Sequence, residues 1–347
     1  MDIKQMLKDL TETRGLSGFE NNIALKLKNI LKKYCTKVDI DKYKSIIGYI
    51  PCGKKNAKKI MLEAHLDQIG LMVSEIDNKG RVGFINLGGV DERILPGSEV
   101  FIVGKSKEVF GIIAEKNTIQ NYTTDEKKVK NSKIEELFID TGYTKKDIEK
   151  NIQIGSAVIL KSAMKNMLND KFFGSAMDNR AGIVAILNTL EKLQNKSINY
   201  DIYIVFTSQE ELGLRGAYTT TFEIMPDYAI AIDVTHGMTP DTKDEIGVFP
   251  LGSGAIICRG PNLHYDLTKK IIQIAKENNI SHKIEVASGG SGTTAWAIQT
   301  VGNGVPVALI SIPLRYMHTN VETLSLFDIE SVSKLLNKIL TGGAFDA

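Results

Sequence analysis

The sequence has little cysteine, and this shortage narrows the classes of protein that it can encode. Its 3 cysteines, Cys35, Cys52 and Cys258, are widely separated in 347 residues and include no Cys-x-x-Cys pair. An odd number at such spacing argues against a disulfide scaffold or a zinc knuckle, and it predicts three reduced thiols in or near the core.

Long apolar runs and an excess of charge of one sign are also missing. The longest mainly apolar stretch, Val305–Leu314, contains two prolines, and it is about half of the roughly 20 residues that a membrane-spanning helix needs. Lysine and arginine number 43 against 41 aspartates and glutamates, which excludes a strongly basic nucleic-acid binder. The first residues lack the apolar centre of a secretion signal. We therefore expect a cytoplasmic protein with no membrane or nucleic-acid partner.

The chain does contain enough apolar sequence to build a core. Hydrophobic residues make up 43% and charged residues 24% of it, which is typical of a soluble globular protein. A length of 347 residues exceeds what one hydrophobic core usually serves, so two domains are predicted.

Strand and helix patterns alternate after about Lys165. Helices are expected at 180–193, 267–277, 293–300 and 329–340, and strands at 201–208, 227–233, 282–288 and 305–312. The first seventy residues predict two amphipathic helices followed by strands, with an apolar run at 59–64 that ends at His65. Alternation of this kind is typical of a mostly parallel sheet with helices on both faces. We predict one α/β domain made of residues 1–69 and 164–347.

A β-rich insertion, residues 70–163, is expected to interrupt this domain. Short strand-like runs separated by Gly, Asp and Asn occur at 71–76, 81–89, 98–104, 108–115 and 155–163. Within the insertion, residues 117–133 have almost no apolar periodicity and a lysine-rich end, which predicts a mobile surface loop.

Polar residues that can bind metals stand at the ends of several apolar runs of the α/β domain. Ligands of open α/β sheets bind in the crevice outside the carboxyl ends of the strands. Residues that follow different strands can therefore meet there although they are distant in sequence. Six side chains are expected to converge in this way: His65, Asp178, Glu210, Glu211, Asp233 and His318.

Two histidines and several carboxylates in one crevice favour a divalent cation. Bare carboxylates would repel one another, whereas imidazole nitrogen and carboxylate oxygen are ligands that Zn²⁺ and Co²⁺ accept. The pattern His65-x-Asp67 supports this interpretation, because carboxylates commonly orient metal-binding imidazoles. His236, His264 and His282 lack such a pattern, and we expect them to be ordinary surface or core residues.

Ordinary structural roles compete with the proposed ones. Asp178 also suits the N-cap of the helix at 180–193, and Glu210 with Glu211 also suits a solvated charged pair. The glutamates, however, directly follow a run of apolar β-formers and precede Gly213, where a neutral turn is typical. Their position favours the functional interpretation.

Five segments occur in one order over nearly the whole chain: AHLDQIG (64–70), AMDNRAG (176–182), QEELGLRGA (209–217), AIDVTHG (231–237) and IPLRYMHTNVE (312–322). Together they resemble a family of dinuclear-metal aminopeptidases that includes glutamyl, deblocking and tetrahedral aminopeptidases, some of which are labelled cellulase or endoglucanase. That family inserts a β-rich, barrel-like dimerisation domain into an α/β catalytic domain. The resemblance implies the same division here.

The resemblance also implies which residues hold the metals. Asp178 would bridge two divalent cations, with His65 and Asp233 completing one site and Glu211 and His318 the other. Zinc is the expected metal, and cobalt or manganese are alternatives, because all three accept these ligands.

The implied reaction is hydrolysis of N-terminal residues from short peptides. A water activated between the two cations would attack the peptide bond, Glu210 would act as general base, and Asp67 would position the His65 ring. The resemblance further implies a homo-oligomer, with dimers joined through the insertion and, in the tetrahedral members, six dimers that enclose a hollow particle.

The chain departs from the family pattern near the expected substrate pocket. Gln68 stands where Glu is usual, Ser175 where Lys is usual, and Thr294 and Trp296 where Asp and Gly are common. Residues 111–120 lack the usual Pro and His. None of these residues is a predicted ligand, so the departures concern substrate preference. Trp296 either adds a large apolar body to the cleft or fills the helix–sheet core.

Two other functions remain open, and a third is disfavoured. One is metal-dependent deacylation of N-acyl amino acids, and another is a non-catalytic oligomer that has lost activity. Glycoside hydrolysis is disfavoured because it needs two carboxyl groups about 5 to 9.5 Å apart around a sugar bond. That mechanism leaves the histidines and Asp233 without a role.

Overall fold

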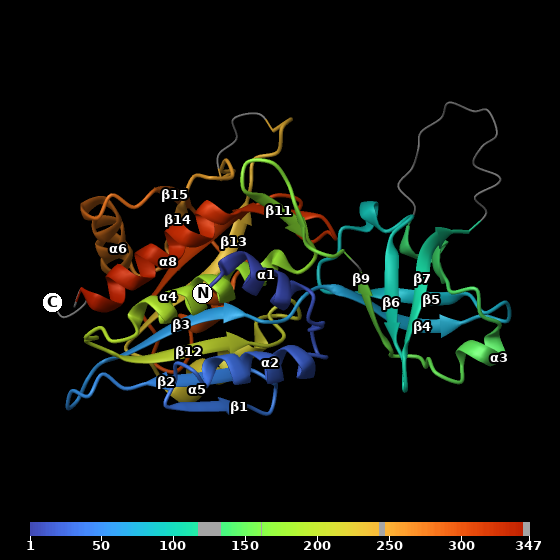
Figure 1. Cartoon of the computed structure of the whole chain (residues 1–347), viewed down its shortest axis with the longest axis horizontal. Helices are drawn as coiled ribbons and strands as arrows, with labels where there is room; N and C mark the ends of the chain where they lie inside the picture. Colours follow the sequence, from blue (N-terminus) through green and yellow to red (C-terminus); the bar gives the residue numbers. More distant parts are fainter. Residues whose placement is uncertain (117–132, 161, 243–246, 343–347) are drawn as a thin grey trace. The chain divides into compact units, whose positions relative to one another are not determined.

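The computed structural model of the chain describes residues 1–116, 133–160, 162–242 and 247–342. It divides into two compact units (Figure 1). The larger unit comprises Met1–Gln68, Ala163–Met317 and Glu322–Ala347, and the smaller comprises Ile69–Ser162 and His318–Val321. The segment 117–132, where a mobile loop is expected, lies outside the described residues.

An eight-stranded mixed sheet forms the centre of the larger unit. In spatial order its strands are β1 (Lys37–Ile40), β2 (Ile46–Ile50), β12 (Asp201–Thr207), β3 (Lys59–His65), β13 (Tyr228–His236), β16 (Val307–Leu314), β14 (Ala255–Arg259) and β15 (His282–Val286). The four central strands, β12, β3, β13 and β16, are parallel. Their carboxyl ends therefore share one edge of the sheet.

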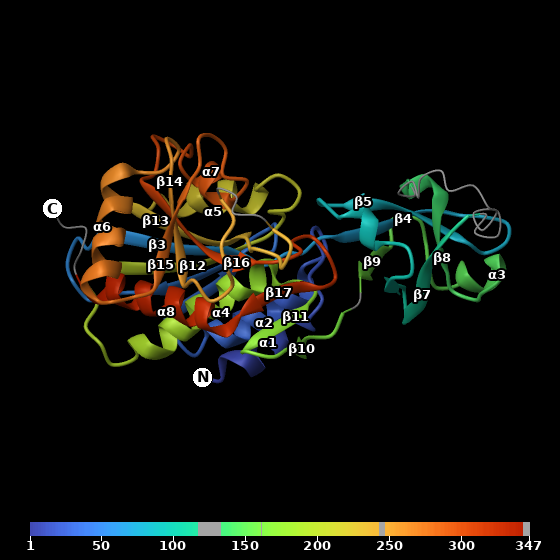
Figure 2. The same cartoon turned by 90° about the horizontal axis from the view of Figure 1, so that it is seen from above.

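Helices cover both faces of this sheet, as Figure 2 shows. One face packs in a common core with α1 (Ile3–Thr11), α2 (Asn21–Leu31), α4 (Met177–Leu193), α6 (Tyr265–Glu277) and α8 (Leu326–Thr341). The opposite face packs with α5 (Arg215–Ile224) and α7 (Thr294–Ile298). Successive side chains of β3 point to opposite faces of the sheet, so the strand contributes to both cores. Ile60 and Leu62 belong to the first core and Met61 belongs to the second.

A small second sheet holds the beginning of α4. It consists of β10 (Lys165–Asn166), β11 (Lys171–Gly174) and β17 (Glu322–Ser325). Gly174 pairs with Glu322 across β11 and β17, which brings the Glu322 side chain to the turn that leads into α4.

The smaller unit is a closed antiparallel barrel. Around it run β4 (Gly70–Ile76), β5 (Val82–Leu87), β8 (Leu137–Asp140), β7 (Glu108–Glu115), β6 (Glu99–Val103) and β9 (Ala157–Leu160). Among the residues that the structure describes, short helices connect them: η1 (Glu92–Ile94), η3 (Ile134–Glu136) and α3 (Lys145–Ile148). Alternate strand residues such as Val82, Val100 and Ile139 fill its interior.

The predicted fold class is confirmed, with a mostly parallel sheet between helices and an inserted barrel. The sequence patterns did not indicate α5, β8 or β14. Strand β14 runs antiparallel to β16, so one edge of the sheet is antiparallel. No helix in the described part of the chain is both long and apolar enough to cross a bilayer.

Candidate metal centre

The sheet register brings His65 and Asp233 to the same level. Parallel strands β3 and β13 pair Glu63 with Ala231, and each of the two site residues follows its paired residue by two positions. Both side chains therefore project at the carboxyl edge of the sheet. They are nearly inaccessible to solvent, with side-chain exposures of 2% for His65 and 6% for Asp233.

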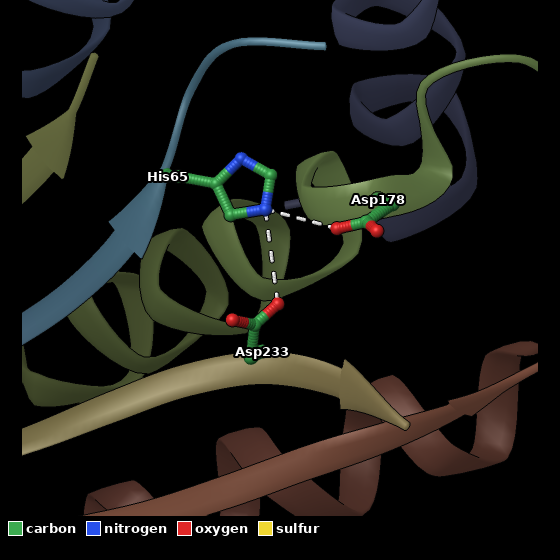
Figure 3. Close-up of side chains that lie close together, drawn as sticks. All are labelled: His65, Asp178 and Asp233. Carbon is green, nitrogen blue, oxygen red and sulfur yellow. Dashed lines mark hydrogen bonds and ion pairs between the residues drawn. The ribbon is translucent and has the colours of Figure 1, made fainter. Parts of the chain in front are cut away.

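The imidazole of His65 faces two buried carboxylates (Figure 3). Its Nε2 atom lies 2.9 Å from Oδ1 of Asp178 and 3.7 Å from Oδ1 of Asp233. Its Nδ1 atom lies 3.2 Å from the main-chain carbonyl oxygen of Asp67, which can only accept a hydrogen bond, so Nδ1 donates. This bond directs Nε2 toward the two carboxylates.

Asp178 does not serve as the helix cap that its position suggested as an alternative. Asn179 caps the helix instead, because its Oδ1 accepts the N–H of Gly182 at 3.1 Å. The Asp178 carboxylate is thus available to the site, where it faces His65. Glu322 holds the turn from behind, since its Oε2 accepts the N–H groups of Met177 at 2.8 Å and of Asp178 at 3.2 Å.

Glu210 and Glu211 follow β12 and are anchored by the buried carboxylate of Asp67. Oδ1 of Asp67 accepts the N–H of Glu210 at 3.0 Å, and Oδ2 accepts the N–H of Glu211 at 3.2 Å. Both glutamates are half-buried, so they are not a solvated surface pair. Asp67 therefore contributes twice, through its carbonyl to the His65 ring and through its carboxylate to the glutamates.

Electrostatics at this edge of the sheet oppose the ionised carboxylates. Burial raises the pKa of Glu210 to about 8, although the nearby His65 lowers it. Burial also raises the pKa of Glu211 and that of Asp233 well above their usual values, and the charge of Asp178 contributes in both cases. Burial by itself would lower the pKa of His65, but Glu210 and Asp178 raise it far above the usual value. Strong pKa perturbation at one place is typical of a functional site.

Among the described residues of the larger unit, two groups of side chains have the composition and spacing of metal ligands. One ligand atom from each of His65, Asp178 and Asp233 lies within 4.8 Å of the others, and the same holds for His65, Glu210 and Glu211. A divalent cation would remove the repulsion that raises the carboxyl pKa values, because it replaces shared protons as the source of positive charge. The donor set of imidazole nitrogen and carboxylate oxygen fits such an ion.

His318, the remaining predicted ligand, belongs to the smaller unit. Its backbone adopts a left-handed φ of 63°, which is uncommon outside glycine. Its Nδ1 donates to the carbonyl oxygen of Gly89 at 2.9 Å. The ring is thereby fixed with Nε2 as the nitrogen that can act as a ligand.

The other histidines have ordinary roles, as expected. The ring of His264 caps α6 by accepting the N–H of Leu267 at 3.3 Å. The ring of His282 bonds the carbonyl oxygen of Ile280 at 2.8 Å, and His236 is exposed at the end of β13.

Sequence reasoning missed Glu63, which is fully buried in β3. One of its oxygens accepts the hydroxyl of Thr207 at 2.6 Å, and the other accepts the hydroxyl of Thr294. Burial raises its pKa to about 7. A charged residue within the apolar run KIMLEA was the available signal, because an isolated carboxylate in a central strand needs dedicated partners.

Glu20 and Arg180 are further buried charges that sequence reasoning missed. Glu20 has 1% exposure and Arg180 has none. Burial raises the pKa of Glu20 to about 7 and lowers that of Arg180 to about 9. Nothing in the local pattern around Glu20 indicated burial, because Asp67 and Gln209, which lie near its carboxyl group, are distant in sequence.

Trp296 does not fill the helix–sheet core. Its side chain is 41% exposed on α7, whereas Ala295 and Ala297 of that helix are buried. The first turn of α7 carries Thr294, whose hydroxyl bonds Glu63 two positions before His65. The indole therefore lies on the outward side of a helix that is tied to the strand bearing His65.

Comparisons with known proteins show that this chain is a hydrolase of the aminopeptidase class, and they identify its family. Residues 45–335 match the M42 glutamyl aminopeptidase family. The lysyl aminopeptidase of Pyrococcus furiosus is 31% identical over 341 residues, which cover 97% of this chain and 96% of that protein. The chain belongs to the M42 family of aminopeptidases.

Solved structures agree with this assignment. An aminopeptidase from the archaeon Desulfurococcus kamchatkensis superposes with a TM-score of 0.91 at 32% identity, covering 98% of this chain and 94% of that one. The TET1 peptidase of Pyrococcus horikoshii, which can assemble into a tetrahedron or a large octahedral shell, has a TM-score of 0.84 at 27% identity, with 100% of both chains covered. A Thermotoga maritima relative with 28% identity, a TM-score of 0.79 and 97% coverage of both chains is called an endoglucanase.

Proposed function

We propose that this protein removes N-terminal residues from short peptides and uses two divalent cations per subunit to do so. The supporting observation is the buried His65 imidazole, whose Nε2 faces Asp178 at 2.9 Å and Asp233 at 3.7 Å. Such a cluster is costly without a cation and favourable with one. Membership of the M42 family supports the peptide substrate.

Five residues are proposed as the metal ligands. His65 and Asp233 would hold one ion, Glu211 and His318 the other, and Asp178 would bridge them. His318 follows β16, the strand beside the one that carries Asp233, and its Nδ1 is already engaged by Gly89. When bound, the cations would polarise the scissile carbonyl and make a nearby water more acidic.

Glu210 is proposed as the general base. Its main-chain N–H is held by Asp67, and its carboxylate lies in one group with His65 and Glu211, where a carboxylate can take a proton from water and return it. The carboxylate would accept a proton from the attacking water and deliver it to the leaving amine. Asp67 would act as a positioning residue through the main chains of Glu210 and Glu211.

The deciding experiment compares metal content and peptide turnover in matched variants. The Glu210→Gln substitution should abolish release of amino acids from short peptides while bound zinc, cobalt or manganese stays near two ions per subunit. Glu223→Gln, at an exposed position on α5, is the control and should retain both properties. Equal turnover in the Glu210→Gln and parent proteins would remove Glu210 from the role of base.

A second comparison separates peptidase from deacylase and glycosidase activity. Peptides with a free amino terminus and their N-acetylated forms should be offered to the metal-loaded protein, and only the free forms should be hydrolysed. Hydrolysis confined to the acylated forms would instead establish a deacylase. Sugar release that survives chelation would establish a glycosidase, for which no metal is required.

We also propose that the barrel joins subunits into dimers, which could assemble further as in TET1 of P. horikoshii. Three apolar side chains on two barrel strands are about half exposed, Ile85 at 46%, Phe110 at 48% and Ile112 at 45%. Apolar side chains that alternate with the barrel interior are costly to leave in water. Light scattering should give the mass of a dimer or a multiple of it, and Phe110→Asp should reduce that mass; a monomeric parent protein would refute the proposal.

A cytoplasmic location is proposed from the state of the cysteines. All three are free thiols, and burial raises the pKa of Cys35 and that of Cys258 to about 12. Such thiols are poorly reactive and suit a reducing compartment. Alkylation of protein from lysed cells should modify all three after denaturation without prior reduction.

A further inference from the structure

Three consecutive backbone N–H groups around the candidate base donate to two buried carboxylates. Asp67 accepts those of Glu210 and Glu211. The third belongs to Gln209, and Oε1 of Glu20 accepts it at 3.2 Å. The segment 209–211 is thus held from two directions, by the residues after β3 and by the residues before α2.

Gln209 is the residue of this segment that most needs support. Its φ is 53°, in the left-handed region that a residue with a side chain adopts at a cost of about 1 kcal/mol or more. The orientation of Glu210 depends on this conformation, because the main chain turns there between β12 and the glutamates. A hydrogen bond to the Gln209 N–H acts directly on that turn.

Glu20 is itself rigidly placed. The same Oε1 atom accepts the N–H of Gly18 at 2.7 Å. The preceding residues are joined to the strand end that bears Asp67, because the N–H of Ser17 donates to Gln68 and that of Gln68 donates to Gly15, both at 3.0 Å. Residues 15–20 therefore form a brace between the Asp67 segment and Gln209.

The side chain of Arg180 lies against this brace. Its guanidinium is wholly buried, and its nitrogens make no hydrogen bond with the residues that the structure describes. The charges of Asp67 and Glu20 act on it. A Cβ atom on Gly15 would lie 2.5 Å from its Nη2, so the brace packs directly over the guanidinium.

We propose that Glu20 is a positioning residue that sets the main-chain conformation of Gln209 and thereby the placement of Glu210 and Glu211. This inference rests on the proposed function for its catalytic consequence. The structural part, an ordered 209–211 segment that depends on Glu20, does not require activity.

Three substitutions of Glu20 distinguish the effect of its side-chain length from the effect of its charge. Glu20→Gln keeps an acceptor oxygen at the same reach, Glu20→Asp keeps the charge but withdraws the carboxylate, and Glu20→Ala removes the acceptor. Leu25→Ala, on α2 and outside residues 15–20, changes a side chain that is 58% exposed and serves as the control. We expect Glu20→Gln and Leu25→Ala to resemble the parent and Glu20→Asp and Glu20→Ala to differ from it.

The primary measurement is amide hydrogen exchange of a peptide spanning residues 207–214 in the chelated proteins. Exchange should be about 10-fold faster in Glu20→Asp and Glu20→Ala, as expected when a hydrogen bond is lost. In the metal-loaded proteins, kcat should fall by roughly 10- to 100-fold in these two variants while KM changes little, because misplaced reacting groups slow the chemical step.

The outcomes distinguish this inference from the proposed function. Parent-like exchange in both Glu20→Asp and Glu20→Ala would overturn the inference, even if the parent protein is an active peptidase. A Glu20→Gln variant as impaired as Glu20→Asp would also overturn it, because charge rather than reach would then matter. If Glu20→Ala does not fold, the difference in exchange between Glu20→Gln and Glu20→Asp still tests the positioning role of Glu20.

If the metal-loaded parent hydrolyses no peptide, the proposed function fails. Amide exchange alone then tests the positioning role.

Discussion

The side chain of Asn179 donates a hydrogen bond of 2.7 Å to the carbonyl oxygen of Ile232. The two residues stand beside the site, since Asn179 follows Asp178 and Ile232 precedes Asp233. Because Asn179 also caps α4 through the N–H of Gly182, a single amide fixes the helix start against β13. This relationship sets the spacing of two candidate ligands.

Replacing Asn179 by alanine should weaken both the fold and metal binding. Loss of the cap and of the bond to Ile232 should lower the free energy of unfolding by about 2 kcal/mol. Zinc affinity should fall about 10- to 100-fold, as for other residues that orient ligands. Denaturant unfolding and competition with a chromophoric chelator measure the two effects.

The matched control is Asn188→Ala, also on α4. Asn188 is buried and donates to Ser333 at 2.9 Å, away from the site. This variant should lose stability without losing zinc affinity. If both variants lost affinity equally, Asn179 would have no specific role in ligand placement.

The chelated protein should become less stable as the pH rises from about 5 to 8. Burial raises the pKa of Glu210 from 4.5 to about 8, so the folded state binds a proton that the unfolded state releases in this range. His65 acts in the same direction, because its raised pKa gives stability that is lost as the pH climbs above the usual value. Thermal unfolding at constant ionic strength measures the slope.

Metal loading should flatten this pH dependence, because a cation replaces the proton as the partner of the carboxylates. Glu210→Gln should reduce the slope in the chelated protein, since the amide does not titrate. An unchanged slope in that variant would mean that other groups cause the dependence.

Replacing Trp296 by alanine should change substrate preference more than stability. The indole is 41% exposed, so the free energy of unfolding should change by less than about 1 kcal/mol. The ratio of kcat/KM between aromatic and small N-terminal residues should shift by about 10-fold, the scale of a lost apolar contact. A panel of aminoacyl substrates measures it, with Phe222→Ala on α5 as an exposed aromatic control that should leave the ratio unchanged.

Gly15→Ala should destabilise the protein through Arg180. An added Cβ would lie 2.5 Å from Nη2 of Arg180 and 2.6 Å from Cγ2 of Ile23, and overpacking of this kind costs about 1–3 kcal/mol. Gly289→Ala is the control, because a Cβ atom added there would meet no atom within 4 Å. If the two variants had equal free energies of unfolding, the segment around Gly15 would be able to move aside for the added Cβ atom without loss of stability.

Regular elements with a strong local period could be predicted from the sequence. The helix expected at 267–277 is α6, Tyr265–Glu277, and the strand expected at 201–208 is β12, Asp201–Thr207. Helix α5 was not predicted, because it carries exposed apolar residues such as Phe222, which is 70% exposed. Such residues obscure the one-sided pattern on which the prediction depends.

The sequence predicted which residue types form the candidate site, but it did not predict the residues that hold the main chain of the site in place. His65 and Asp233 close apolar runs of the sequence, and that position pointed to the crevice. Glu20 and Glu322 act through main-chain N–H groups of segments that are far away in sequence. Their partners become visible only when the chain is folded, so no local pattern marks them.

Hydrophobic periodicity along the sequence was enough to specify the alternation of strands and helices apart from α5, β8 and β14, the β-rich insertion and the residue types that follow the apolar runs. The folded arrangement was needed to establish that Asn179 rather than Asp178 caps α4, that Asp67 anchors the glutamates, and that Trp296 faces outward. Hydrogen bonding and burial depend on which residues are close in space, and a local sequence pattern does not contain this information. Two positions with the same local pattern can therefore differ entirely in what surrounds them.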